Sequence, residues 1–133
     1  MKSNNNYISI DYGTRKSGLA YSVEWFCFAW KTVLTKDLLD ILPKWIHDRK
    51  STMIIIGMPY NIDGTMSKHG KRVDEFAKKL ENIVQIPIVF HDERLSTSEA
   101  LLWFDEYGIN GDIDAEAARL ILVDFLHQNK SAQ

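Results

Sequence analysis

The sequence contains a single cysteine, Cys27, among its 133 residues. One thiol cannot form an intramolecular disulfide, so we expect a fold without disulfide bonds in a reducing, cytoplasmic setting. The longest aliphatic run, Met53–Ile56, is far too short to cross a bilayer. The polar start MKSNNN leads directly into a strand-like segment, a pattern that predicts no signal peptide. These absences argue against a disulfide-rich secreted fold and against a membrane-spanning one.

Internal repeats, low-complexity tracts and linkers rich in Pro, Gly or Ser are also missing. A length of 133 residues therefore suits one compact domain, which we expect to span residues 1–133. The net charge of −2 argues mildly against a nucleic-acid partner, but the charges are unevenly placed. Residues 91–133 are strongly acidic, whereas residues 67–79 are rich in Lys and Arg. An acidic end and a basic strip suit a phosphodiester substrate, and a solvated basic helix face is the alternative.

Strand patterns and helix patterns alternate along the chain. Period-two or β-branched segments predict strands at 7–11, 18–24, 26–34, 52–57 and 86–90. Apolar residues at helical spacing predict helices within 35–46, 73–84, 96–108 and 113–127. Thr35 is expected to cap the first of these helices, and Pro43 to kink or shorten it. Three consecutive strands followed by alternating helices and strands predict an α/β fold, with a mixed sheet between helices.

Three acidic residues, Asp11, Glu93 and Asp114, stand where one element ends or the next begins. Hard divalent cations take oxygen ligands, so carboxylates brought together in this way predict a metal site. Asp11 follows a strand, at the end where open α/β sheets bind ligands, although an Asp in a turn can also bind backbone amides. Asp114 lies on the stripe expected to pack on the sheet, where a lone carboxylate would be costly. An N-cap role is the alternative for Asp114.

Asp92 and Glu93 are adjacent, and side chains of adjacent strand residues point to opposite faces. We therefore expect one of them to reach the site, with Glu93 preferred as ligand and Asp92 as the alternative. Favourable placement at a helix N-terminus would also explain an acid here. Arg94 could steady this pair or contact a phosphate.

The segment 57–65 reads as a loop before a basic helix. Its backbone amides, the side chain of Asn61 and the helix N-terminus could receive a phosphate, and a plain loop is the alternative. Lys68 and Arg72, together with His69, could contact a nucleic-acid backbone from the helix.

Taken in order, four motifs resemble the YqgF/RuvX family. They are IDYGTRKSGLA (10–20), GMPYNIDGTMSKHGKRVDEFAKKL (57–80), HDERLSTSEA (91–100) and DAEAARLIL (114–122). Family members are described as nucleases of pre-16S rRNA and as proteins like Holliday-junction resolvases. The resemblance implies an RNase H-like fold with a five-stranded mixed sheet and helices on both faces. It also implies that Asp11, Glu93 and Asp114 are the catalytic acids.

By this resemblance the chain is expected to hydrolyse phosphodiester bonds at the 5′ end of a 16S rRNA precursor. The three acids would hold Mg²⁺ or Mn²⁺, while Arg15 or Lys16, Arg94 and Asn61 would orient the substrate backbone. The chain departs from the family at Lys16, where the pattern has Arg, and Lys lacks the guanidinium fork for bidentate phosphate contacts.

Three other functions remain to be compared with this one. A resolvase that cuts branched DNA would use the same acids but would need a dimer, so the chain could be a monomer or a homodimer. A non-catalytic RNA-binding factor in ribosome assembly could use the same fold. An actin-like ATPase has a similar phosphate loop, but it needs two domains around its nucleotide, and 133 residues supply one.

Overall fold

The computed structural model describes residues 6–93 and 113–132, and a five-stranded sheet lies at its centre. The strand order is β3-β2-β1-β4-β5. Strands β1 and β2 pair antiparallel, as do β2 and β3, whereas β1 and β4 pair parallel, as do β4 and β5. The predicted mixed sheet of five strands is confirmed. Its strands are β1 (Tyr7–Asp11), β2 (Lys16–Val23), β3 (Phe26–Leu34), β4 (Met53–Met58) and β5 (Ile88–Asp92).

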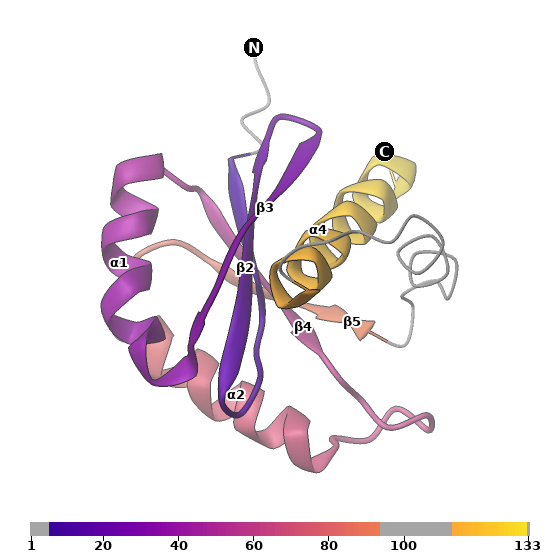
Figure 1. The fold of residues 1–133 in the computed structure, drawn as a ribbon. Helices are drawn as coiled ribbons and strands as arrows, with labels where there is room; N and C mark the ends of the chain where they lie inside the picture. The colour runs from indigo at the N-terminus through magenta and orange to yellow at the C-terminus, as the bar shows by residue number, and fades with distance from the viewer. Residues whose placement is uncertain (1–5, 94–112, 133) are drawn as a thin grey trace.

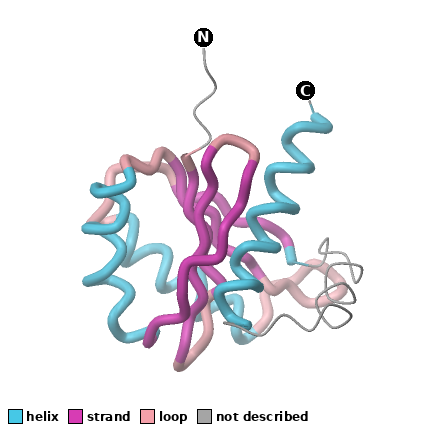
Figure 2. The backbone as a smooth tube through the Cα atoms, turned by 45° about the horizontal axis from the view of Figure 1, so that its top comes forward, coloured by secondary structure: helices cyan, strands magenta, loops and turns pink. Residues whose placement is uncertain are grey.

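Helices cover both faces of this sheet. Figure 1 shows α1 and α2 on one side of the strands and α4 on the other, and the turned view in Figure 2 shows the same three layers. The predicted arrangement is therefore confirmed, while the helix expected at 96–108 lies outside the described residues. The helical elements are the 3-10 turn η1 (Thr35–Asp37), α1 (Leu38–Arg49), α2 (Lys68–Glu81) and α4 (Ile113–Ala132). No helix in the described ranges combines the length and hydropathy of a membrane span.

The start of α1 differs from the sequence prediction. Thr35 does not cap the helix, because its hydroxyl donates to the carbonyl of Gly13 (2.7 Å) and lies 2.7 Å from the Ser17 hydroxyl. This side chain therefore fixes the β1–β2 turn. Pro43 does not shorten the helix, which continues to Arg49. Proline removes one backbone hydrogen bond, but the buried face of α1 packs on the sheet, and such packing supplies most of a helix's stability.

Strand β5 ends two residues later than predicted. The apolar run suggested an end at Phe90, whereas parallel pairing with β4 continues through His91 to Asp92, which lies opposite Met58. Pairing starts at Ile88, directly after Pro87, which has no N–H for the ladder. Asp92 thus belongs to the strand, and Glu93 is the first residue beyond it.

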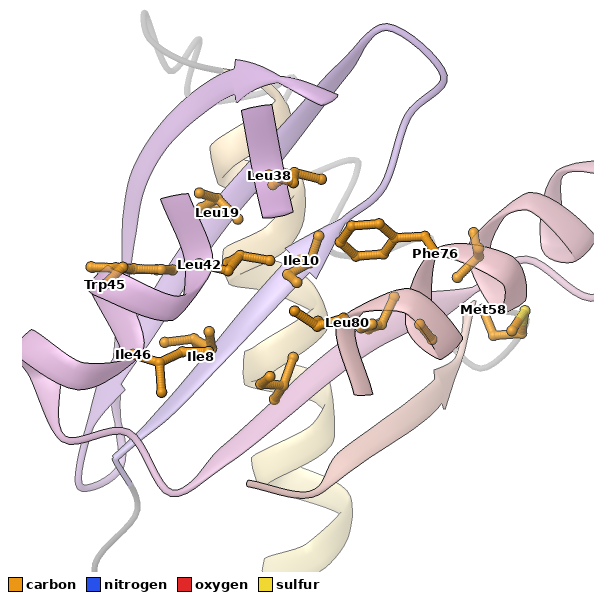
Figure 3. Close-up of a cluster of buried hydrophobic side chains, with 14 residues drawn as sticks. Ile8, Ile10, Leu19, Leu38, Leu42, Trp45, Ile46, Met58, Phe76 and Leu80 are labelled. Carbon is orange, nitrogen blue, oxygen red and sulfur yellow. The ribbon is translucent and has the colours of Figure 1, made fainter. Parts of the chain in front are cut away.

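The main hydrophobic core fills the space between the sheet and the helices α1 and α2. Figure 3 shows side chains of β1 and β2 meeting those of both helices. Alternation along β1 directs Ile8 and Ile10 to this core, and Tyr7, Ser9 and Asp11 to the side of α4. The buried members are Ile8, Ile10, Leu19, Leu38, Leu42, Trp45, Ile46, Ile54, Ile56, Met58, Val73, Phe76, Ala77 and Leu80.

The layer between the sheet and α4 is smaller and more polar. Its buried cluster consists of Ile55, Ile121, Leu122 and Leu126. Buried Ser9 donates a hydrogen bond from its hydroxyl to the carbonyl of Ala118 (2.7 Å), which ties β1 to the helix. This layer continues toward the end of β1 where Asp11 stands.

Candidate active site

Asp11 is the last residue of β1, and its side chain lies on the α4 side of the sheet. Ser9, two residues earlier, contacts α4 directly, and side chains two positions apart in a strand share a face. On the neighbouring strand, Gly18 is the residue paired with Asp11. Asp11 therefore stands at the carboxyl end of a central strand, beside the start of α4.

The first turn of α4 reaches this point because Gly18 has no side chain. A Cβ atom at Gly18 would overlap the backbone carbonyl of Asp114, so no other residue fits without moving the helix. Buried Ala115 and Ala118 continue this close contact along α4. Ala117, in the same turn of α4, is only half-buried. The close approach places Asp114 next to Asp11.

Glu93 reaches the same face from the other side, across β4. A Cβ at Gly57 would overlap the Glu93 Oε1 atom and would lie 2.7 Å from Ile121 Cδ1 of α4. The Glu93 carboxylate thus lies over Gly57, in the space that a larger residue would fill. Asp92 points to the opposite face by strand alternation, since buried His91 contacts Phe125 of α4.

The charges of Glu93 and Asp114 both affect the pKa of Asp11. Burial, reinforced by the Glu93 and Asp114 carboxylates, raises the pKa of Asp11 to about 7, and nearby His69 opposes this rise. Burial, with a smaller contribution from the Asp92 charge, also raises the pKa of Glu93. Buried carboxylates that repel one another favour binding of a proton or of a cation. At neutral pH, therefore, this site favours a compensating positive charge.

The donor set fits a hard divalent cation, because it consists of carboxylate oxygens. Within residues 6–93 and 113–132, however, no three Asp, Glu, His or Cys side chains converge closely enough to hold a metal ion. The acids therefore share one electrostatic environment without forming a coordination sphere in this structure. Their side chains would have to move to bring the oxygens onto one ion.

His69 anchors the residue that follows Asp11. Its Nε2 atom lies 2.7 Å from the carbonyl oxygen of Tyr12, and since a carbonyl only accepts, Nε2 is the donor. The rings of Tyr12 and Phe76 also pack, with centroids 4.9 Å apart. Sequence reasoning grouped His69 with the cations of α2 as a backbone contact. Its role in fixing the loop after Asp11 has no sequence signal, because it depends on how α2 docks.

The loop before α2 is closed by its own hydrogen bonds. Asn61 donates from its side-chain amide to the Thr65 hydroxyl (2.9 Å), and the Ser67 hydroxyl accepts from the Gly70 amide (2.9 Å). Ser67 also donates to the carbonyl of Pro59, so it caps α2 and holds the loop. The Asn61 amide is thus engaged within the loop, and its predicted contact with a phosphate stays a prediction.

The predicted cationic residues fall into two places. Arg15 and Lys16 are exposed at the β1–β2 turn, and alternation from Gly18 puts Lys16 on the face of Asp11. Lys68 and Arg72 are exposed on α2, on the other side of the sheet from α4. Of the predicted cations within the described ranges, Lys16 is the one that strand alternation places on the face of the acids. Arg94 lies outside the described residues.

Comparison with known proteins identifies the family. A family model described as "RuvX: Holliday junction resolvase" matches residues 5–128. The chain belongs to the RuvX family. A relative from Buchnera aphidicola is 37% identical over 93% of this chain and 98% of its own length. A second, from Wigglesworthia glossinidia brevipalpis, is 34% identical over 96% of this chain and 95% of its own length. Both are named "Putative pre-16S rRNA nuclease".

The solved structures support the fold assignment. The RuvC protein of T. thermophilus, solved in complex with a Holliday junction substrate, superimposes with a TM-score of 0.62. The superposition covers 93% of this chain and 96% of RuvC, at 9% identity. At so low an identity the likeness concerns the fold alone, and it confirms the RNase H-like prediction. Membership of the RuvX family confirms the predicted nuclease class.

Proposed function

We propose that this RuvX-family chain is a metal-dependent nuclease that hydrolyses phosphodiester bonds of a 16S rRNA precursor in the cytoplasm. The observation that carries the proposal is the meeting of three acids at the end of β1. Gly18 lets Asp114 approach Asp11, and Gly57 leaves room for the Glu93 carboxylate. The two neighbouring carboxylates, together with burial, raise the pKa of Asp11 to about 7. The names of the relatives, which refer to pre-16S rRNA, supply the substrate class.

In this proposal Asp11, Glu93 and Asp114 hold one or two Mg²⁺ or Mn²⁺ ions. A bound divalent ion would lower the pKa of an attacking water and neutralise charge on the phosphoryl oxygens. Gly18 and Gly57 let the helix and the Glu93 carboxylate approach closely. Lys16, on the same face, is suited to contact a phosphate of the substrate, as a point charge.

The direct test compares cleavage of a labelled 16S rRNA precursor, with Mg²⁺ or Mn²⁺, by the wild type and by Asp11→Asn, Glu93→Gln and Asp114→Asn. Loss of a residue that merely orients a metal ligand costs ~10–100-fold in activity, so loss of a ligand should cost more than ~100-fold. Asp92→Asn is the matched control, because this acid points to the other face, and its rate should stay within about threefold of wild type. Equal rates in all five proteins would refute the proposal.

A second measurement follows metal binding without cleavage. A ligand that binds only the folded state stabilises it by about 2.7 kcal/mol when present at ~100 times its Kd. Mn²⁺ should therefore raise the melting temperature of the wild type, and it should do so much less for the double variant Asp11→Asn/Asp114→Asn. An equal rise in both proteins would place the ion elsewhere.

The matching family model is described as a Holliday junction resolvase, and this favours a second candidate. Such an enzyme would cut branched DNA with the same acids, in a homodimer that presents two sites related by a two-fold axis. A four-way DNA junction in the cleavage assay, together with the mass in solution, separates this candidate from a monomeric RNase. Metal-independent RNA binding that survives loss of all three acids, without cleavage, would instead indicate a ribosome-assembly factor.

A further inference from the structure

A groove of about 380 Å³ opens at the end of β1, on the side of the sheet that α1 and α2 cover. Neither Glu93 nor Asp114 lines it. A second depression of about 380 Å³ adjoins it and shares the lining residues Thr14 and Lys36. The two hollows together follow the β1–β2 turn and reach Arg15. Together they form a continuous concave surface beside the residues that follow Asp11.

The groove is strongly cationic. Lys36 of η1 and Arg72 and Lys79 of α2 line it, with Glu75 as the acidic residue among its lining side chains. Within the described residues, none of these three cations forms a salt bridge. By contrast Lys78, one position before Lys79, pairs with Asp74 (3.1 Å). The groove therefore carries a net positive charge, from three cations that hold no salt-bridge partner in the described ranges and one carboxylate, Glu75.

The groove begins one residue beyond the acidic site. Asp11 faces α4, while Tyr12 packs on Phe76 and lines the groove on the opposite face. His69 holds the carbonyl of Tyr12, so this boundary is fixed. A strand bound at the acids that passes over the end of β1 would enter the groove directly.

We propose that this groove binds the phosphodiester backbone of the single-stranded nucleic acid that leaves the acidic site. Lys36 and Lys79, next to Arg72, contact its phosphates. The inference rests on the nuclease function proposed above, because that function brings a polyanion to the end of β1. A row of cations without carboxylate partners is the expected counterpart of such a chain.

The experiment compares two double variants that change the net charge equally. Lys36→Ala/Lys79→Ala removes groove cations, and Lys44→Ala/Lys78→Ala removes exposed lysines that pair with Asp48 and Asp74. Binding of a labelled single-stranded RNA is measured with EDTA over a range of salt concentrations. Each lost phosphate contact lowers the slope of log K against log salt by ~0.7 for a single strand. The groove variant should therefore lose about 1.4 of slope, and the control variant close to none.

An equal loss of salt slope in the two variants would show that net charge alone explains the effect. An unchanged slope in both would show that the groove does not bind RNA. Either outcome overturns the inference. Circular dichroism checks that all proteins are folded. In the cleavage assay, the groove variant should raise KM with kcat within about twofold of wild type.

Asp11→Asn separates the two proposals. If it stops cleavage while the groove variant binds normally, the nuclease proposal stands and the groove inference fails. If the salt slope falls as expected but no protein cleaves RNA, the nuclease proposal fails instead.

Discussion

The two faces of the sheet differ in what they bury. Among residues 6–93 and 113–132, the α1/α2 face carries a cluster of 14 buried apolar residues, whereas the α4 face carries a cluster of four. Ser9, His91 and Glu116 are buried polar residues on or beside the α4 layer. Apolar burial contributes about 25 cal/mol per Å², so among the described residues the α1/α2 face supplies most of the hydrophobic stabilisation.

Buried ionisable groups are a second feature of the α4 face. Within the described residues, the buried atoms His91 Nε2 and Asp124 Oδ2 have no hydrogen-bond partner. Burial lowers the pKa of His91 and raises that of Asp124, since it disfavours the charged form of each. Elsewhere on α4, Arg119 compensates buried Glu116 by donating to its carboxylate from Nε (2.7 Å). The α1/α2 face thus stabilises the fold. The α4 face instead retains buried ionisable side chains that lower stability, as functional sites do.

The largest expected effect is on stability, and it compares one core substitution on the α1/α2 face with one on the α4 face. Leu42→Ala removes a fully buried side chain from the α1/α2 core and should lower the free energy of unfolding by about 3–5 kcal/mol. Leu126→Ala on the α4 face should cost nearer ~2 kcal/mol, because Leu126 also lines an open depression of about 200 Å³ where solvent can enter. Urea unfolding of the two variants measures both values. A larger loss for Leu126→Ala would reverse the comparison.

The sequence predicted the architecture because most elements carry strong periodic patterns. The errors lie where tertiary contacts decide. The end of β5 depends on its pairing with β4 and not on its own apolar run. Thr35 was expected to cap a helix, yet its hydroxyl bonds the β1–β2 turn, a contact with Gly13 across 22 residues. Pro43 stays within α1 because its neighbours on the helix are buried.

The acids could be chosen from sequence because each follows or begins an element, but their surroundings could not. Gly18 and Gly57 matter only because α4 and Glu93 come to lie against them. The bond from His69 to Tyr12 joins residues 57 positions apart. Lys36 and Lys79 look like ordinary surface lysines until the fold places them in one groove. Such contacts leave no local pattern in the sequence.

Gly18→Ala tests whether close helix contact on the α4 face serves the acids. The new Cβ would overlap the Asp114 carbonyl, so α4 must shift, at a cost of about 1–3 kcal/mol in stability. Because the shift moves Asp114, RNA cleavage should fall by more than ~10-fold even when the protein is fully folded. Gly70→Ala is the control: its Cβ would meet the flexible Met66 side chain at 2.8 Å and the Ser67 hydroxyl at 3.1 Å, but no backbone of another element. Ala also favours a helix by about 1 kcal/mol relative to Gly. Normal cleavage by folded Gly18→Ala would show that the contact serves stability alone.

The smallest expected effect is the pH dependence that Asp11 gives to stability in EDTA. Its pKa is about 7 in the fold and 3.8 for an isolated Asp, so between these values the folded state binds the extra proton. Stability therefore falls as pH rises through this range, and the contribution is lost above pH 7. From about pH 6 to about pH 8, wild type should lose about 1 kcal/mol relative to Asp11→Asn, by urea unfolding. Mn²⁺ should shrink this difference, because a bound cation replaces the proton as the compensating charge. If the free energies of unfolding of the two proteins in EDTA changed in parallel with pH, burial beside the other two acids would not destabilise the charged form of Asp11.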